Sequence, residues 1–176
     1  MTNIIDYLAN FYPTELREKN WNIDHNTGVW LSDFIIKHNL HTILELGTSV
    51  GVSASYLALS TTGIVTTIES NPARFNQANI NFSALKITNI ISLQNHAPEC
   101  FKTLNDDFDF VFIDCIKMYY KEFTEYCIHH FRQLRYIILD NTSSHKNQLT
   151  DFFEYINQYN YKTVEIGSGL VVITIS

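Results

Sequence analysis

Short runs of consecutive apolar residues alternate with segments of helical periodicity along most of the chain. A run of about four to eight apolar residues is typical of a strand buried on both faces, whereas apolar residues at three- and four-residue spacing are typical of an amphipathic helix. The pattern predicts strands at residues 42–46, 63–69, 90–94, 108–114 and 136–140. It predicts helices at residues 54–60, 72–85, 117–131 and 149–156.

The two ends of the chain depart from this alternation. Residues 1–40 have helical patterns, broken at Pro13, and we expect them to form an N-terminal helical cap. Residues 161–166 and 170–175 predict two strands joined by a glycine-rich, hairpin-like turn. The sequence therefore predicts a single α/β domain over residues 1–176. Its sheet would be mostly parallel and seven-stranded, with helices on both faces and one antiparallel strand from the C-terminal hairpin.

Composition and charge narrow the class of protein. Hydrophobic residues make up 45% of the 176 residues, charged residues 17%, and the net charge is −6. These values are typical of a globular domain, and the acidic balance disfavours nucleic acid as a partner. Neither a long apolar run nor a signal-peptide pattern is present, so we expect no membrane span. The three cysteines have no metal-binding or redox spacing, which fits a cytoplasmic location.

The segment after the first predicted strand carries a ligand-binding signal. Glu45 stands at the end of the apolar run, and Gly47 and Gly51 form a turn before a helix. Glycine lets the main chain approach a ligand closely, and the free N–H groups of the helix point at the same place. Ser49 takes the position of the middle glycine in the dinucleotide motif G-x-G-x-x-G. A glycine turn without a ligand is the open alternative.

Acidic residues stand at the ends of four predicted strands: Glu45, Glu69, Asp114 and Asp140. The carboxyl ends of parallel strands meet at one edge of the sheet, where ligands bind in such folds. Glu69 follows Glu45 by 24 positions, at the second strand end, where an acid accepts hydrogen bonds from ribose hydroxyls. A nucleoside with a cationic, phosphate-free tail suits this acidic site, and S-adenosylmethionine is such a molecule.

Oxygen ligands gather at two neighbouring strand ends. Asp114, Asp140 and Asn141 supply two carboxylates and an amide oxygen, which are the ligands that Mg²⁺ and Ca²⁺ prefer. Lys117 follows Asp114 by three positions, and a bound cation would favour its neutral amine and a phenolate acceptor. Each acid or amide taken alone is as well explained as a helix cap, and Lys117 as a solvated lysine.

Over nearly its whole length the sequence resembles the class I S-adenosylmethionine-dependent methyltransferases, and most closely the catechol/caffeoyl-CoA O-methyltransferase-like family. The matching segments are residues 43–53, 68–72, 108–117, 139–141 and 167–170, together with Gly28, Leu31 and Tyr120. The resemblance implies a Rossmann-like fold, S-adenosylmethionine as the cofactor and a divalent cation, with Mg²⁺ expected.

The resemblance also implies a role for individual residues. The residues implied to bind the cofactor are Glu45, Gly47, Thr48, Ser53, Glu69, Ala97 and Asp114. Among these, Glu45, Gly47 and Ser53 would hold the methionine end, Glu69 the ribose, and Ala97 would lie beside the adenine. The implied metal ligands are Asp114, Asp140 and Asn141, and Lys117 is the implied catalytic residue.

Departures from the family pattern bear on the acceptor. Ile116 stands where the family often has a second acid, and Tyr119 stands where asparagine is usual. Trp21 is a candidate to line the mouth of the acceptor site. We predict an O-methyltransferase for a hydroxyl of a small, catechol-like or phenolic acceptor. An RNA-modifying O-methyltransferase of the same fold and a cofactor-binding regulator without catalysis stay open, as does a homodimer.

Overall fold

The computed structural model describes residues 4–19, 22–96, 98–104 and 107–175. Its seven-stranded sheet has the order β3-β2-β1-β4-β5-β7-β6. The strands are β1 (Thr42–Leu46), β2 (Ile64–Glu69), β3 (Ile90–Gln94), β4 (Phe110–Ile113), β5 (Tyr136–Leu139), β6 (Asn160–Val164) and β7 (Leu170–Thr174). The first five are parallel, and β7 runs antiparallel to both of its neighbours, β5 and β6. The predicted fold class, including the single antiparallel strand, is confirmed.

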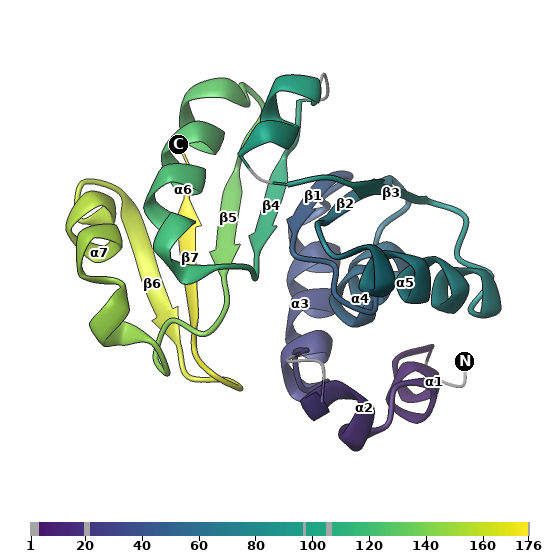
Figure 1. The fold of residues 1–176 in the computed structure, drawn as a ribbon. Coiled ribbons are helices and arrows are strands. Elements are labelled where there is room, and N and C mark those ends of the chain that lie inside the picture. Colours follow the sequence, from purple (N-terminus) through teal and green to yellow (C-terminus); the bar gives the residue numbers. More distant parts are fainter. Residues whose placement is uncertain (1–3, 20–21, 97, 105–106, 176) are drawn as a thin grey trace.

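Helices cover both faces of the sheet (Figure 1). One face carries α3 (His25–His38), α4 (Val52–Ser60) and α5 (Pro72–Ala84), and the other carries α6 (Tyr120–His130) and α7 (Thr150–Ile156). The short helices α1 (Ile4–Phe11) and α2 (Thr14–Lys19) precede α3, and α1 packs on α4. None of the helices in the described ranges is long and apolar enough to cross a lipid bilayer.

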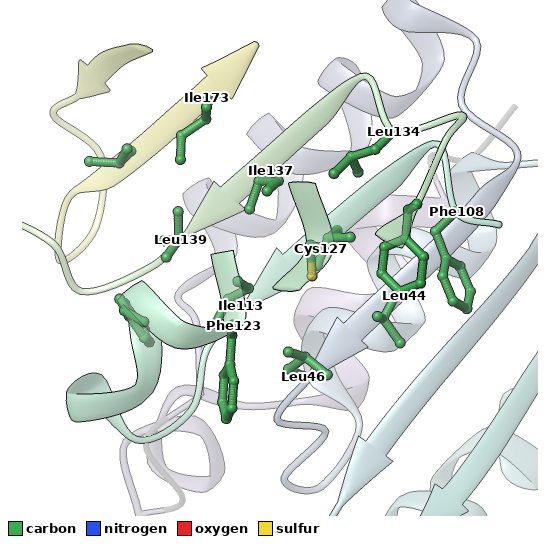
Figure 2. Packing of buried hydrophobic residues seen from close by; sticks show 14 of the residues in the cluster. Leu44, Leu46, Phe108, Ile113, Phe123, Cys127, Leu134, Ile137, Leu139 and Ile173 are labelled. Atoms are coloured by element: carbon green, nitrogen blue, oxygen red, sulfur yellow. The ribbon is translucent and has the colours of Figure 1, made fainter. Parts of the chain in front are cut away.

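Alternation along β1 divides its side chains between two buried clusters. Leu44 and Leu46 belong to the cluster under α6 and α7, where they lie with residues such as Ile113 and Cys127 (Figure 2). Ile43 belongs to the cluster on the opposite face, under α3 and α4. Because side chains alternate with a period of two, Glu45 points to the same face as Ile43. The carboxylate of Glu45 therefore lies at the edge of the apolar cluster under α3 and α4.

The predicted boundaries differ from the structure where side chains or tight turns end an element. The strand predicted at 108–114 is shorter, since β4 begins at Phe110. The preceding Asp109 carboxylate accepts hydrogen bonds from the N–H groups of His41 (2.8 Å) and Thr42 (3.1 Å). The helix predicted from Lys117 starts as a 3₁₀ turn, η2 (Lys117–Tyr119). Short 3₁₀ turns also occur at η1 (Glu99–Thr103), between β3 and β4, and at η3 (Lys146–Gln148).

Candidate active site

A cavity of about 580 Å³ lies at the carboxyl ends of the parallel strands. The predicted site residues that line it are Gly47, Ser53, Glu69, Asp114, Lys117 and Asn141. Glu69 ends β2, and the others follow β1, β4 and β5; these four strands are consecutive in the sheet. The topology therefore brings together side chains that are almost a hundred positions apart in the sequence.

Glu45 lies behind this cavity and is fully buried. Its Oε2 accepts a hydrogen bond from the hydroxyl of Thr67, its register partner on β2, while its Oε1 has no partner among the described residues. Burial raises the pKa of Glu45 to about 7, against the smaller lowering effect of the nearby Ser53 and Thr67 hydroxyls. A cationic ligand group is the type of partner that would offset this burial.

Thr48 contributes to the same buried chain of hydrogen bonds. Its hydroxyl lies 2.5 Å from that of Thr67, and its side chain is fully buried. The side chain therefore lies beneath the loop and orients Thr67 and Glu45. The prediction that Thr48 binds the cofactor has no support from its side chain, which is turned to the sheet.

The loop after β1 adopts a conformation that favours glycine. Gly47 has φ of 107° and Gly51 has φ of 91°, both in the left-handed region. A Cβ atom on Gly47 would collide with the main-chain carbonyl oxygen of Asp114. Gly47 is thus required by the close approach of the loops after β1 and β4, in addition to any approach to a ligand.

Glu69 is held by two main-chain donors at the cavity wall. Its Oε2 accepts a hydrogen bond from the N–H of Ser49 (2.7 Å), and its Oε1 accepts one from the N–H of Asn71 (2.8 Å). Asn71 also caps α5, since its side chain accepts hydrogen bonds from the first turn of that helix. The carboxylate is therefore fixed in orientation, and each oxygen keeps a lone pair for a ligand hydroxyl.

Asp114 and Lys117 form an ion pair at the other end of the cavity. Lys117 Nζ lies 3.2 Å from Asp114 Oδ1, and their side chains are only 14% and 12% exposed. Burial raises the pKa of Asp114, and the adjacent Lys117 ammonium partly opposes that rise. Lys117 also lies 5.1 Å from the centre of the Tyr120 ring.

Asp140 and Asn141 complete this group at the end of β5. Burial, and then the charge of nearby Asp114, raise the pKa of Asp140 to about 7. Ser168, in the turn between β6 and β7, donates to Asp140 Oδ1 (3.1 Å). The amide nitrogen of Asn141 donates to Ser168 Oγ (2.6 Å) and to Asp140 Oδ2 (3.3 Å), which leaves the amide oxygen for a ligand.

These residues fit a divalent cation by the chemistry of their donors. Two largely buried carboxylates, both with raised pKa values, and one amide oxygen offer hard oxygen ligands. Within the described ranges, no three His, Cys, Asp or Glu side chains come close enough to form a metal site. A cation here would thus depend on Asn141 and on ligands from outside the chain.

The structure assigns site roles that the sequence did not indicate. Ser49, Ser168 and Thr67 orient the acids, and Asn22 and His145 line the cavity. Thr67 is recognisable only once the register of β1 and β2 is known, and Ser168 only once the hairpin is placed. Ala97 and Trp21 lie outside the described residues, so their predicted roles stay predictions.

Comparisons with known proteins bear on the family and the fold of the chain. The family model of O-methyltransferases matches residues 4–154. A search among curated protein sequences gives no match. Among solved structures, a Staphylococcus aureus protein assigned as a caffeoyl-CoA O-methyltransferase is 26% identical, with a TM-score of 0.82, 99% of this chain and 93% of that chain being covered.

Two structures with bound cofactor have the same fold. A Podospora anserina methyltransferase bound to S-adenosylhomocysteine has a TM-score of 0.86 at 16% identity, covering 100% of this chain and 89% of that one. The O-methyltransferase TomG from Streptomyces achromogenes, in complex with S-adenosylmethionine, has a TM-score of 0.84 at 17% identity, covering 100% and 91%. The chain belongs to the O-methyltransferase family, as its resemblance to class I S-adenosylmethionine-dependent methyltransferases predicted.

Proposed function

We propose that this methyltransferase transfers the methyl group of S-adenosylmethionine to a hydroxyl of a small, catechol-like or phenolic acceptor, with the help of a divalent cation. The observation that carries the proposal is that Glu69, Asp114 and Asn141 line one cavity of about 580 Å³, with Asp140 buried beside Asn141. A cavity of this size suits a cofactor and a small acceptor together.

The cofactor would lie along the ends of β1 and β2. Glu69 is oriented to accept hydrogen bonds from the ribose hydroxyls, because main-chain N–H groups hold its two oxygens. Glu45 offers an unpartnered, buried carboxylate oxygen to the cationic amine of the methionine end. Ser53 and the turn at Gly47 would complete that end. Holding the methyl donor in this way places it for an in-line transfer at roughly 3–3.5 Å.

The acceptor hydroxyl would lie beside Asp114, Asp140 and Asn141, which would hold Mg²⁺ or a similar cation. When bound, this cation would stabilise the acceptor oxygen as its anion and offset the repulsion between the two carboxylates. Lys117 Nζ lies 3.2 Å from Asp114, where it is an ammonium without a lone pair. A bound cation would take over the pairing with Asp114 and favour the neutral amine, which would then accept the hydroxyl proton.

The walls of the cavity favour a small aromatic acceptor. Ile116, Tyr119 and Phe123 line it, and Ile116 is 63% exposed at its rim. These side chains give an apolar surface beside the polar metal-ligand group, which suits a ring that carries adjacent hydroxyls. A cytoplasmic location and a homodimer stay predictions.

Methyl transfer from labelled S-adenosylmethionine tests the proposal. Catechol, its monomethyl ether, phenol and a structured RNA would be compared as acceptors, each with added Mg²⁺ and with excess chelator. We expect the highest rate with catechol and Mg²⁺, and a loss of that rate in chelator. Transfer to RNA alone would support the RNA-modifying alternative. Tight cofactor binding without transfer to any acceptor would support the non-catalytic regulator.

A further inference from the structure

The N-terminal cap contacts the turn after β1 through one buried side chain. Tyr12 follows α1 and is fully buried in the apolar cluster under α3 and α4. Its hydroxyl oxygen lies 3.3 Å from the main-chain carbonyl oxygen of Gly51 and 3.1 Å from Ser55 Oγ on α4. Ser55 Oγ in turn lies 2.7 Å from the same carbonyl oxygen. The three oxygen atoms are therefore all within hydrogen-bond distance of one another.

This triangle keeps the Gly51 carbonyl oxygen hydrogen-bonded in every arrangement of its hydrogens. Each hydroxyl has one hydrogen to donate, and the carbonyl has none. If both hydroxyls donate within the triangle, at least one of them must donate to the carbonyl oxygen. Burial raises the pKa of Tyr12, and the smaller lowering effect of the Ser55 hydroxyl does not cancel that rise. The phenol therefore stays a neutral donor at the pH of an ordinary assay.

The turn that carries this carbonyl group has a conformation that needs support. Ser49 has φ of 50°, in the left-handed region that residues with a Cβ atom adopt rarely. Such a conformation persists only where the surrounding contacts determine it. Asn81 on α5 supplies one contact, because its Nδ2 donates to the carbonyl oxygen of Val50 (2.8 Å). The two hydroxyls at Gly51 supply another, from the opposite side of the sequence.

The same turn orients a carboxylate at the cavity wall. The main-chain N–H of Ser49 donates to Glu69 Oε2 (2.7 Å). If the turn changed its conformation, this donor would move away and Glu69 would lose one of the two main-chain groups that hold it. Ser49 and Gly51 are only two positions apart, so the contact from the cap and the contact to Glu69 depend on the same few main-chain torsions.

We propose that Tyr12 is a positioning residue for the cofactor, which keeps the turn at residues 47–51 in its binding conformation through the Gly51 carbonyl oxygen. This inference rests on the proposed role of Glu69 at the ribose. Without the hydroxyl, a fraction of the molecules would have the turn in another conformation. The measured dissociation constant rises as the fraction with the binding conformation falls. Each ligand that contains the adenosine would therefore lose affinity by the same factor.

Tyr12→Phe tests the contact, because it removes the hydroxyl and keeps the ring in its cluster. S-adenosylhomocysteine and 5′-methylthioadenosine share the adenosine, and calorimetry should show both bound about three- to tenfold more weakly. In turnover, KM for S-adenosylmethionine should rise by the same factor, while kcat and the acceptor KM stay unchanged. Tyr7→Phe, which removes an exposed hydroxyl from α1, is the matched control and should change none of these values.

A second variant separates positioning from a general loss of stability. Ile35→Val removes a buried carbon from the cluster that contains Tyr12, so it should lower the melting temperature without removing a polar group. Its affinity for S-adenosylhomocysteine should change by less than about twofold. An equal loss of affinity in Ile35→Val, or a fall in kcat at saturating cofactor in Tyr12→Phe, would overturn the inference. Normal affinity in Tyr12→Phe would overturn it alone, whereas an unmodified chain that binds neither ligand would also contradict the proposed function.

Discussion

At the β1–β2 end of the cavity, main-chain groups hold the ligand-facing carboxylate, whereas at the β4–β5 end most of the partners are side chains, with the main-chain N–H of Asn141 as an additional donor to Asp140. Glu69 accepts hydrogen bonds from the main-chain N–H groups of Ser49 and Asn71. These bonds break only if the loops that carry the donors unfold locally. Asp114 and Asp140 are held instead by Lys117, Ser168 and Asn141 through side-chain atoms. Side chains can exchange one partner for another at a small cost, whereas a main-chain donor is fixed by the fold.

The difference indicates that the two ends of the cavity are pre-organised for their ligands to different extents. The β1–β2 end is arranged for its ligand in advance, so binding there requires little rearrangement. At the β4–β5 end, burial raises the pKa values of Asp114 and Asp140, the charge of Asp114 raises that of Asp140 further, and Lys117 offsets only part of these rises. A bound cation would offset the buried charge in place of Lys117, and the partners of Asp114, Asp140 and Lys117 would change. The following predictions test this contrast, from the largest expected effect to the smallest.

Removal of the Asp140 carboxylate, one of the proposed metal ligands, should have the largest effect on turnover. Asp140→Asn keeps the side-chain shape but removes the charge, and turnover should fall to the background rate, as it should in chelator. The affinity for S-adenosylhomocysteine should change by less than about twofold, because the β1–β2 end is untouched. Single-turnover transfer and calorimetry measure the two effects, with Asp151→Asn on the exposed side of α7 as the control. A parallel loss of cofactor affinity would mean that the two ends are not independent.

Lys117→Met tests the proton acceptor at the same end. The substitution keeps the stem and removes the amine, so the rate of methyl transfer at neutral pH should fall by roughly 10²–10⁴-fold. The loss should shrink at high pH, where the acceptor hydroxyl ionises without help. A pH–rate profile measures both features, and Lys121→Met, an exposed lysine of α6, is the control. An unchanged profile would remove Lys117 from the mechanism and leave orientation as the main source of catalysis.

At the other end, Glu69→Ala should weaken cofactor binding without abolishing transfer at saturating cofactor. Loss of hydrogen bonds to a charged group predicts about a tenfold or larger loss of S-adenosylhomocysteine affinity. Calorimetry measures this loss, and Glu122→Ala, at an exposed position of α6, is the control. Normal affinity in Glu69→Ala would contradict the ribose assignment.

The smallest effect concerns stability and Glu45. Burial raises the pKa of this acid from 4.5 to about 7, so between these values the folded chain holds a proton that the unfolded chain has lost. Stability attributable to Glu45 is therefore full below that window and falls as pH rises through it. The melting temperature of the ligand-free protein should drop by a few degrees from about pH 5 to pH 8, and Glu45→Gln should reduce that drop. An equal drop in Glu45→Gln and in the exposed control Glu15→Gln would remove Glu45 as its source.

Local patterns in the sequence predicted much of the sheet and the acids at its edge. The apolar runs that end in Glu69 and Asp140 were sufficient to place these acids at the edge of the sheet, because a buried strand and the loop after it are continuous in the chain. Contacts between distant segments were not predictable. Ser168 reaches Asp140 across 28 positions, and the partner of Glu45 depends on strand register. Gly47 was assigned to ligand approach, whereas its Cβ would also collide with the Asp114 carbonyl. A Gly47→Val variant would therefore test folding before it tests binding.

The place of β7 between β5 and β6 has a consequence for local unfolding. Because β6 pairs with β7 alone among the described strands, separation of β7 from β5 releases both strands as one hairpin. Detachment would withdraw Ser168 from Asp140 and Asn141, so the proposed cation site would be lost in that open state. Cation binding should then suppress the opening, and main-chain amides of β6 and β7 should exchange with deuterium more slowly when Mg²⁺ is present. The amides of β2, at the other end of the sheet, should exchange at the same rate with or without it.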